Sequence, residues 1–229
     1  IYIVGRYPDK DTFINCFREV NEAGFEFIEI GLPFNDPVAD GPVISEAAHS
    51  VIDNNVTCKE IIDDIISLHD ISIKKYIMTY GNIVYSFGID RFNSLLKDHL
   101  SGLILADVPN RLAEMFYNEG LEIPIVPFAT PETRDEDILA MKDSNSEFIY
   151  FVGIRGITGS KANLKDKELI AKVKKIKEMT GKKVIIGFGI KTREDAQEAL
   201  QISDGYVVGT EAVRRQGTSD FKNYIRGLL

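Results

Sequence analysis

The sequence predicts a (β/α)8 barrel, that is, a single TIM-barrel domain over residues 1–229. Eight short apolar runs alternate with longer amphipathic runs along the whole chain, and its length suits one barrel of this kind. No linker rich in Pro, Gly or Ser divides the chain, and the strand–helix period is its only internal repeat. A doubly wound open sheet is the alternative fold for the same order of elements. The barrel places function on the loops that follow the strands.

Strands are predicted where short apolar runs lie between turn residues. In chain order they cover residues 1–4, 26–30, 75–79, 102–106, 123–126, 148–152, 183–187 and 205–208. Helices are predicted where apolar residues recur at helical spacing. They cover residues 10–23, 43–52 with 58–68, 90–99, 111–118, 135–143, 165–179, 193–202 and a last segment that ends near residue 229. Capping boxes mark three helix starts: Thr57 with Glu60, Thr133 with Glu136 and, in a looser form, Thr192 with Asp195.

The composition limits the classes of function. The net charge is 27 − 35 = −8, and an acidic chain is a poor candidate for nucleic-acid binding. Nine lysines lie between residues 161 and 183, but the apolar residues among them recur at helical spacing, so we interpret these lysines as a solvated helix face. Cys16 and Cys58 lie far apart, and the three histidines have no second ligand at metal spacing, so neither a disulfide nor a metal site is predicted. Without a spanning apolar run or a signal peptide, the chain is predicted to be soluble and cytoplasmic, with no membrane contact.

The loop after the second predicted strand carries the strongest signal of chemistry. It brings together three carboxylates, Glu29, Asp36 and Asp40. Successive strand residues point to opposite faces, so Glu29 faces the interior of the fold if its isoleucine neighbours pack under helices. A carboxylate is costly to bury unpaired, and an inward Glu29 therefore indicates a functional role. A buried ion pair or a solvated strand end is the structural alternative.

Glycine-rich loops follow the last three strands, where a barrel commonly binds phosphate. Glycine lets backbone N–H groups approach an anion closely, and a helix that begins at Thr210 adds its positive end. We therefore predict backbone donors at Gly189 and Gly209 and a hydroxyl donor at Thr210. Tyr80 and Tyr150 either contact a substrate or are core aromatics with satisfied hydroxyl groups.

Together these motifs resemble the signature of the tryptophan synthase alpha subunit family. The resemblance spans the chain in order, over residues 29–42, 78–82, 106–109, 156–159, 187–190 and 208–212. It implies a lyase of tryptophan biosynthesis that cleaves indole-3-glycerol phosphate to indole and glyceraldehyde 3-phosphate by a retro-aldol reaction. It also implies that Glu29 and Asp40 are the catalytic carboxylates. It places Thr158 in a mobile loop after the sixth strand, and it places Gly159, Gly189, Gly209 and Thr210 in the phosphate-binding loops. For this substrate, the apolar top of the barrel with Tyr80, Tyr150 and Phe188 is expected to hold indole.

The resemblance also carries expectations about cofactors and partners. The cleavage needs no metal or organic cofactor in this chain. The implied partner is the beta subunit of an alpha2beta2 complex, which uses pyridoxal phosphate to join indole with serine. The family has a short helix before the first strand, so we expect an N-terminal helix to be missing from this sequence. Glu211, next to the predicted phosphate site, departs from the family pattern.

Two other classes of protein share parts of this pattern. Another phosphate-binding barrel enzyme, such as a sugar-phosphate isomerase, would share the glycine-rich loops but has no reason to contain both Glu29 and Asp40. A barrel that serves only as the partner of another subunit would tolerate the loss of either carboxylate. Turnover of indole-3-glycerol phosphate separates the three possibilities.

Overall fold

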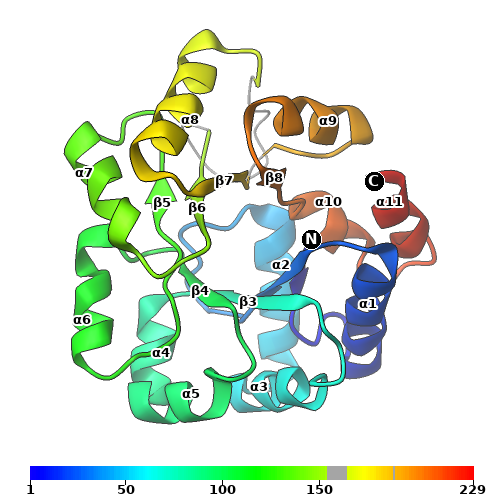
Figure 1. Cartoon of the computed structure of the whole chain (residues 1–229). Helices are drawn as coiled ribbons and strands as arrows, with labels where there is room; N and C mark the ends of the chain where they lie inside the picture. The colour runs from blue at the N-terminus through cyan, green and yellow to red at the C-terminus, as the bar shows by residue number, and fades with distance from the viewer. Residues whose placement is uncertain (154–163, 188) are drawn as a thin grey trace.

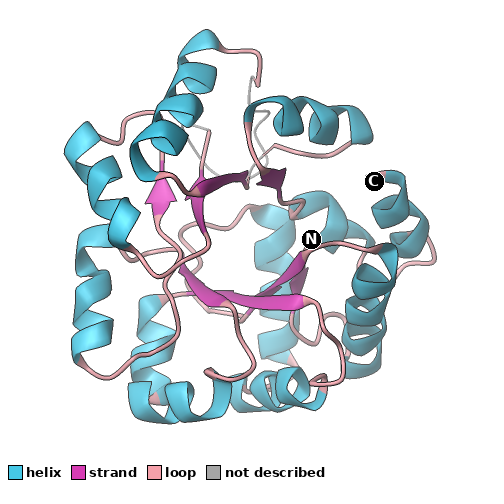
Figure 2. Cartoon of the chain, viewed as in Figure 1, coloured by secondary structure: helices cyan, strands magenta, loops and turns pink. Residues whose placement is uncertain are grey.

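The structure, a computed structural model, describes residues 1–153, 164–187 and 189–229. Parallel strands form a central ring, and helices surround it (Figures 1 and 2). The strands are β1 (Tyr2–Val4), β2 (Phe27–Gly31), β3 (Lys74–Thr79), β4 (Gly102–Leu105), β5 (Phe128–Ala129), β6 (Phe148–Phe151), β7 (Lys183–Ile186) and β8 (Gly205–Tyr206).

Helices follow the strands along the chain. They are α1 (Lys10–Ala23), α2 (Pro42–Asp53), α3 (Cys58–Ser67), α4 (Gly81–Phe87), α5 (Ile89–Leu96), α6 (Ala113–Asn118), α7 (Asp135–Ala140), α8 (Lys167–Thr180), α9 (Arg193–Ile202), α10 (Thr210–Arg215) and α11 (Phe221–Gly227), with short 3-10 helices η1 (Asn110–Leu112) and η2 (Met141–Asp143). The sequence did not predict α4 as a separate helix. No helix in the described ranges is both long enough and apolar enough to span a membrane.

Two parallel half-sheets, β1-β2-β3-β4 and β5-β6-β7-β8, meet at two seams. At one seam the Val126 N–H donates to the Leu103 carbonyl at 2.8 Å. At the other seam the Tyr2 N–H donates to the Val208 carbonyl at 3.0 Å. These hydrogen bonds join the half-sheets into the (β/α)8 barrel that the sequence predicted.

The fifth strand lies further along the chain than the sequence predicted. The expected strand at residues 123–126 forms only an isolated bridge between Ile125 and Leu103, and the paired strand β5 begins at Phe128. Pro124 and Pro127 have no N–H to donate, so a regular ladder cannot run through this segment. Their carbonyl groups still accept backbone hydrogen bonds from β4 and β6.

Two of the three predicted capping boxes are confirmed, those of Thr57 at α3 and Thr192 at α9. The third is wrong. Helix α7 begins at Asp135, and the Thr133 hydroxyl instead accepts the N–H of Thr130 at 2.8 Å. The Thr133 side chain therefore closes a turn with Thr130 and does not cap α7.

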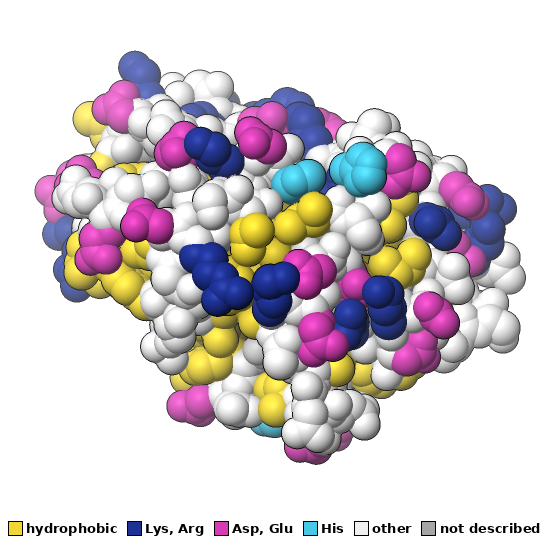
Figure 3. Space-filling model, turned by 90° about the horizontal axis from the view of Figure 1, so that it is seen from below, with side chains coloured by type: hydrophobic (Ala, Val, Ile, Leu, Met, Phe, Trp, Pro, Cys, Tyr) yellow, Lys and Arg dark blue, Asp and Glu magenta, His cyan; other side chains and the backbone are white. Residues whose placement is uncertain are grey.

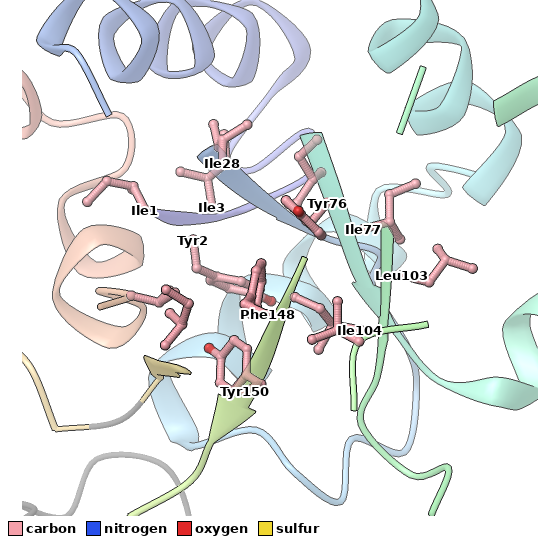
Figure 4. Packing of buried hydrophobic residues seen from close by; sticks show 14 of the residues in the cluster. Ile1, Tyr2, Ile3, Ile28, Tyr76, Ile77, Leu103, Ile104, Phe148 and Tyr150 are labelled. Carbon is pink, nitrogen blue, oxygen red and sulfur yellow. The ribbon is translucent and has the colours of Figure 1, made fainter. Parts of the chain in front are cut away.

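Aromatic side chains fill the barrel interior below the carboxyl ends of the strands. Phe27 stacks on Phe148 with ring centroids 5.5 Å apart, and Tyr76 lies 5.2 Å from Phe148. Figure 4 shows Tyr2 and Tyr150 in the same interior. These rings form a packed core, and in barrels of this kind the active site lies at the carboxyl ends of the strands.

The outer face shown in Figure 3 carries charges of both signs. Lys and Arg side chains alternate with Asp and Glu around small hydrophobic patches, and no large basic area appears on this face.

Candidate active site

Glu29 lies in the barrel interior near the carboxyl end of β2. Its side chain is fully buried, while Ile28 and Ile30 are buried on the opposite, helix-facing side of the strand. This is the orientation that strand parity predicted. The Tyr150 hydroxyl donates to Glu29 Oε2 at 3.4 Å, a long hydrogen bond. Oε1 has no hydrogen-bond partner among the described residues and is available to a ligand.

Burial sets the protonation of Glu29. It raises the pKa of the carboxyl from 4.5 to about 7, and the Tyr150 hydrogen bond opposes this rise. At neutral pH the acid and the carboxylate are therefore both well populated. A carboxyl in this state is suited to give a proton and to take one back.

Asp40 faces the same pocket from the loop between β2 and α2. The Tyr80 hydroxyl donates to Asp40 Oδ2 at 3.2 Å and accepts the N–H of Ala39 at 3.3 Å. The Tyr80 ring also packs on Phe34, with centroids 4.8 Å apart. Partial burial raises the pKa of Asp40, and the Tyr80 hydrogen bond opposes that rise. Tyr80 thus holds the loop and its carboxylate in place.

The pocket joins the two carboxylates to the loops after β7 and β8. Glu29 and Asp40 line it together with Gly189, Gly209 and Thr210. Gly189 has a φ of 83°, a left-handed conformation that favours glycine. Gly209 precedes α10, whose first N–H groups receive no side-chain cap within the described part of the chain. The backbone donors predicted for an anion therefore lie in the same pocket as the carboxylates.

The structure brings together most, but not all, of the predicted site residues. Tyr150 lines the pocket, whereas Tyr80 acts on Asp40 and is not among the described residues that line it. Thr158, Gly159 and Phe188 lie outside the described residues.

Two polar residues that line the pocket, Tyr2 and Lys191, were not predicted from the sequence. Lys191 follows the Gly189-Ile190 turn directly, so reading that loop one residue further would have found it. Tyr2 carried no local signal, because its place beside Glu29 depends on the pairing of β1 with β2.

Glu211, the departure noted next to the predicted phosphate site, is paired with two arginines. Its carboxylate forms ion pairs with Arg214 and Arg215, one turn further along α10. Two cations therefore neutralise it, and its charge does not oppose an anion at the start of the helix.

Gly187 lets the Tyr150 ring reach Glu29. A Cβ built on Gly187 would lie 1.7 Å from Cε1 of Tyr150 and 2.3 Å from its hydroxyl oxygen. We expect Gly187→Ala to displace the ring and to lower kcat/KM by about 10²-fold, because small displacements in a reacting site have effects of this size. An activity assay checks this expectation, with Gly227→Ala as the control, since a Cβ built there has no described atom within 4 Å apart from its chain neighbours and its own helix backbone. Equal kcat/KM values for the two variants would contradict the expected role of this contact.

The fold and the pocket together define a barrel enzyme with its candidate active site at the carboxyl ends of the strands. The family model described as "Tryptophan synthase alpha chain" matches residues 1–224. A tryptophan synthase alpha chain from Thermotoga petrophila is 36% identical over 219 residues, which cover 93% of this chain and 87% of that protein. The chain belongs to the tryptophan synthase alpha chain family.

Solved structures agree with this membership. A structure from Aquifex aeolicus has 30% sequence identity and a TM-score of 0.88, and the match covers 99% of this chain and 89% of that one. A structure of the tryptophan synthase a2b2 complex from the hyperthermophile Pyrococcus furiosus has 28% identity and a TM-score of 0.84, with 99% and 95% covered.

Proposed function

We propose that this chain cleaves indole-3-glycerol phosphate to indole and glyceraldehyde 3-phosphate, as the alpha subunit of tryptophan synthase. Family membership supports the reaction. The observation that carries the mechanism is the fully buried Glu29, whose Oε1 has no partner in the described ranges, in one pocket with Asp40.

Glu29 is the acid and then the base of this mechanism. Its protonated form gives a proton to C3 of the indole ring, which makes the ring cationic. The resulting carboxylate takes the proton of the hydroxyl on the first side-chain carbon, and the carbonyl forms there. The electrons of the broken carbon–carbon bond return to the ring and neutralise it. The pKa of about 7 suits both steps.

Asp40 is the group that stabilises the cationic ring. Its carboxylate accepts the indole N–H, and the positive charge that develops on the ring strengthens this contact as the reaction proceeds. Because the Tyr80 hydroxyl already donates to one oxygen of Asp40, the other oxygen is oriented for the ring. Two carboxyl groups in different surroundings thus take different roles. Side chains of this chain serve each proton transfer, and pyridoxal phosphate belongs to the partner beta subunit.

The substrate phosphate lies against Gly189, Gly209 and Thr210 in this proposal. Gly209→Asp provides a test, because Gly209 has a φ of −103° and a Cβ there would meet its nearest atom at 3.7 Å. We expect the aspartate to raise KM at least about tenfold through like-charge repulsion at short range. Gly209→Asn, of the same size without the charge, should raise KM much less. Equal KM values for the Asp and Asn variants would place the phosphate elsewhere.

The experiment that tests the function is turnover of indole-3-glycerol phosphate, followed by indole release. The chain should be assayed alone and mixed with its cognate beta subunit. We expect cleavage by the chain, faster cleavage in the mixture, and a larger species by light scattering. If no indole is released under either condition, the proposed function is overturned, and another phosphate-binding barrel enzyme is favoured.

A further inference from the structure

Tyr2 is a polar pocket residue for which the proposed mechanism has no role. It lies on β1 and is paired in register with Glu29 on β2, so the two side chains are neighbours on the inner face of the barrel. Its side chain is 5% exposed and lines the pocket together with Asp40. Figure 4 shows it in the interior, in the same region as Tyr150.

The Tyr2 side chain extends from Gly209, in the loop after β8, to Gly31 at the end of β2. Near its base, Cβ of Tyr2 would lie 3.9 Å from a Cβ built on Gly209. At its tip, the hydroxyl oxygen would lie 2.0 Å from a Cβ built on Gly31, so the ring fits only because residue 31 is glycine. The hydroxyl therefore lies at the end of β2, between the buried Glu29 and the loop that carries Asp40.

The Tyr2 hydroxyl is a donor without an acceptor among the residues that the structure describes. The Tyr150 hydroxyl donates to Glu29 and the Tyr80 hydroxyl to Asp40, but Tyr2 makes no side-chain hydrogen bond to another described residue. Burial raises the pKa of Tyr2 well above its ordinary value, and the charges of Asp40 and Glu29 add to that rise. The hydroxyl thus keeps its proton and can donate it in a hydrogen bond.

The substrate offers the Tyr2 hydroxyl one class of hydrogen-bond acceptor, the hydroxyl oxygens of its three-carbon chain. The indole ring has an N–H donor and no oxygen, and the phosphate lies at Gly189 and Gly209 in the proposed site. The hydroxyl oxygens of the three-carbon chain lie between those two ends. We propose that the Tyr2 hydroxyl donates a hydrogen bond to a hydroxyl oxygen of the glycerol chain and so positions that chain beside Glu29. This inference rests on the proposed function of the pocket.

Tyr2→Phe removes this donor and keeps the ring. In the reverse reaction, which condenses indole with glyceraldehyde 3-phosphate, we expect the KM for glyceraldehyde 3-phosphate to rise about tenfold, the range of one neutral hydrogen bond. The KM for indole should stay within about twofold. Indole-3-propanol phosphate lacks both chain hydroxyls, so its inhibition constant should be the same for the variant and the wild type.

Tyr76→Phe is the matched control. Tyr76 is 1% exposed and, like Tyr2, in register with Glu29, here from the β3 side. Its hydroxyl has no partner among the described residues. It packs on Phe27 and Phe148 and, in the described part of the chain, does not line the pocket. We expect its KM values to equal those of the wild type.

The outcomes separate this inference from the function on which it rests. If the wild type condenses the two substrates and Tyr2→Phe has an unchanged KM for glyceraldehyde 3-phosphate, the role of Tyr2 is refuted and the function stands. A parallel loss of affinity for indole-3-propanol phosphate would also refute it, because the effect would then not depend on the chain hydroxyls. A wild type without activity in either direction would overturn both.

Discussion

Replacing Glu29 with glutamine is expected to lower the rate of indole-3-glycerol phosphate cleavage by roughly 10³- to 10⁴-fold while leaving the fold intact. Glutamine has nearly the same shape and still offers an oxygen to the Tyr150 hydroxyl, which donates to Glu29 at 3.4 Å. It cannot give a proton to the ring or take one from the chain hydroxyl, and removal of a general acid–base group has an effect of this size. Single-turnover cleavage, with circular dichroism for the fold, checks this expectation. Activity within a few-fold of the wild type would remove Glu29 from the mechanism.

The same variant is expected to change how stability depends on pH. Burial places the pKa of Glu29 at about 7 in the folded chain, above the 4.5 of an exposed carboxyl. The folded state therefore holds the proton more tightly, so this contribution to stability is complete below pH 4.5 and is lost as pH rises through 7. The loss amounts to about 3 kcal/mol, at 1.36 kcal/mol per pKa unit. Glu29→Gln lacks it.

Urea unfolding at several pH values measures this difference. The free energy of unfolding of the glutamine variant should rise relative to that of the wild type between pH 4.5 and 8. The comparison needs no further control, because every other titrating group is common to the variant and the wild type. Parallel pH profiles would show that Glu29 titrates as an ordinary carboxyl, and its use as an acid at neutral pH would then fail.

The barrel and the inward position of Glu29 were predictable because both depend on local patterns. Strand parity needs only the apolar neighbours Ile28 and Ile30, which the structure buries on the other face. The local apolar pattern predicted the wrong position for the fifth strand, because nearby prolines restrict the backbone there. Pro124 lies within the apolar run 123–126 and Pro127 follows it, so the paired fifth strand forms only at Phe128–Ala129.

The parts of the site that were not predicted depend on contacts between distant segments. The Tyr80 hydroxyl reaches Asp40 across 40 positions of sequence, and no local pattern indicates that pairing. Tyr2 reads as one more apolar strand residue until the register of β1 against β2 places it beside Glu29. The sequence therefore predicts which loops carry the chemistry, whereas the barrel geometry decides which side chains meet there.

Replacing Asp40 with asparagine is expected to lower the cleavage rate by roughly 10²- to 10³-fold, the effect of losing one electrostatic contact to a developing charge. Asparagine can still accept a hydrogen bond from the Tyr80 hydroxyl, so the loop should keep its place while the negative charge opposite the indole N–H is lost.

Tyr80→Phe makes the complementary change, because the charge of Asp40 stays and the loop loses the hydrogen bonds that the Tyr80 hydroxyl makes to Asp40 and Ala39. We expect a smaller loss of rate for that variant. Asp36→Asn is the matched control, since Asp36 lies exposed in the same loop. If Asp40→Asn behaves like Asp36→Asn, the charge of Asp40 does not stabilise the ring, and Glu29 carries the reaction without it.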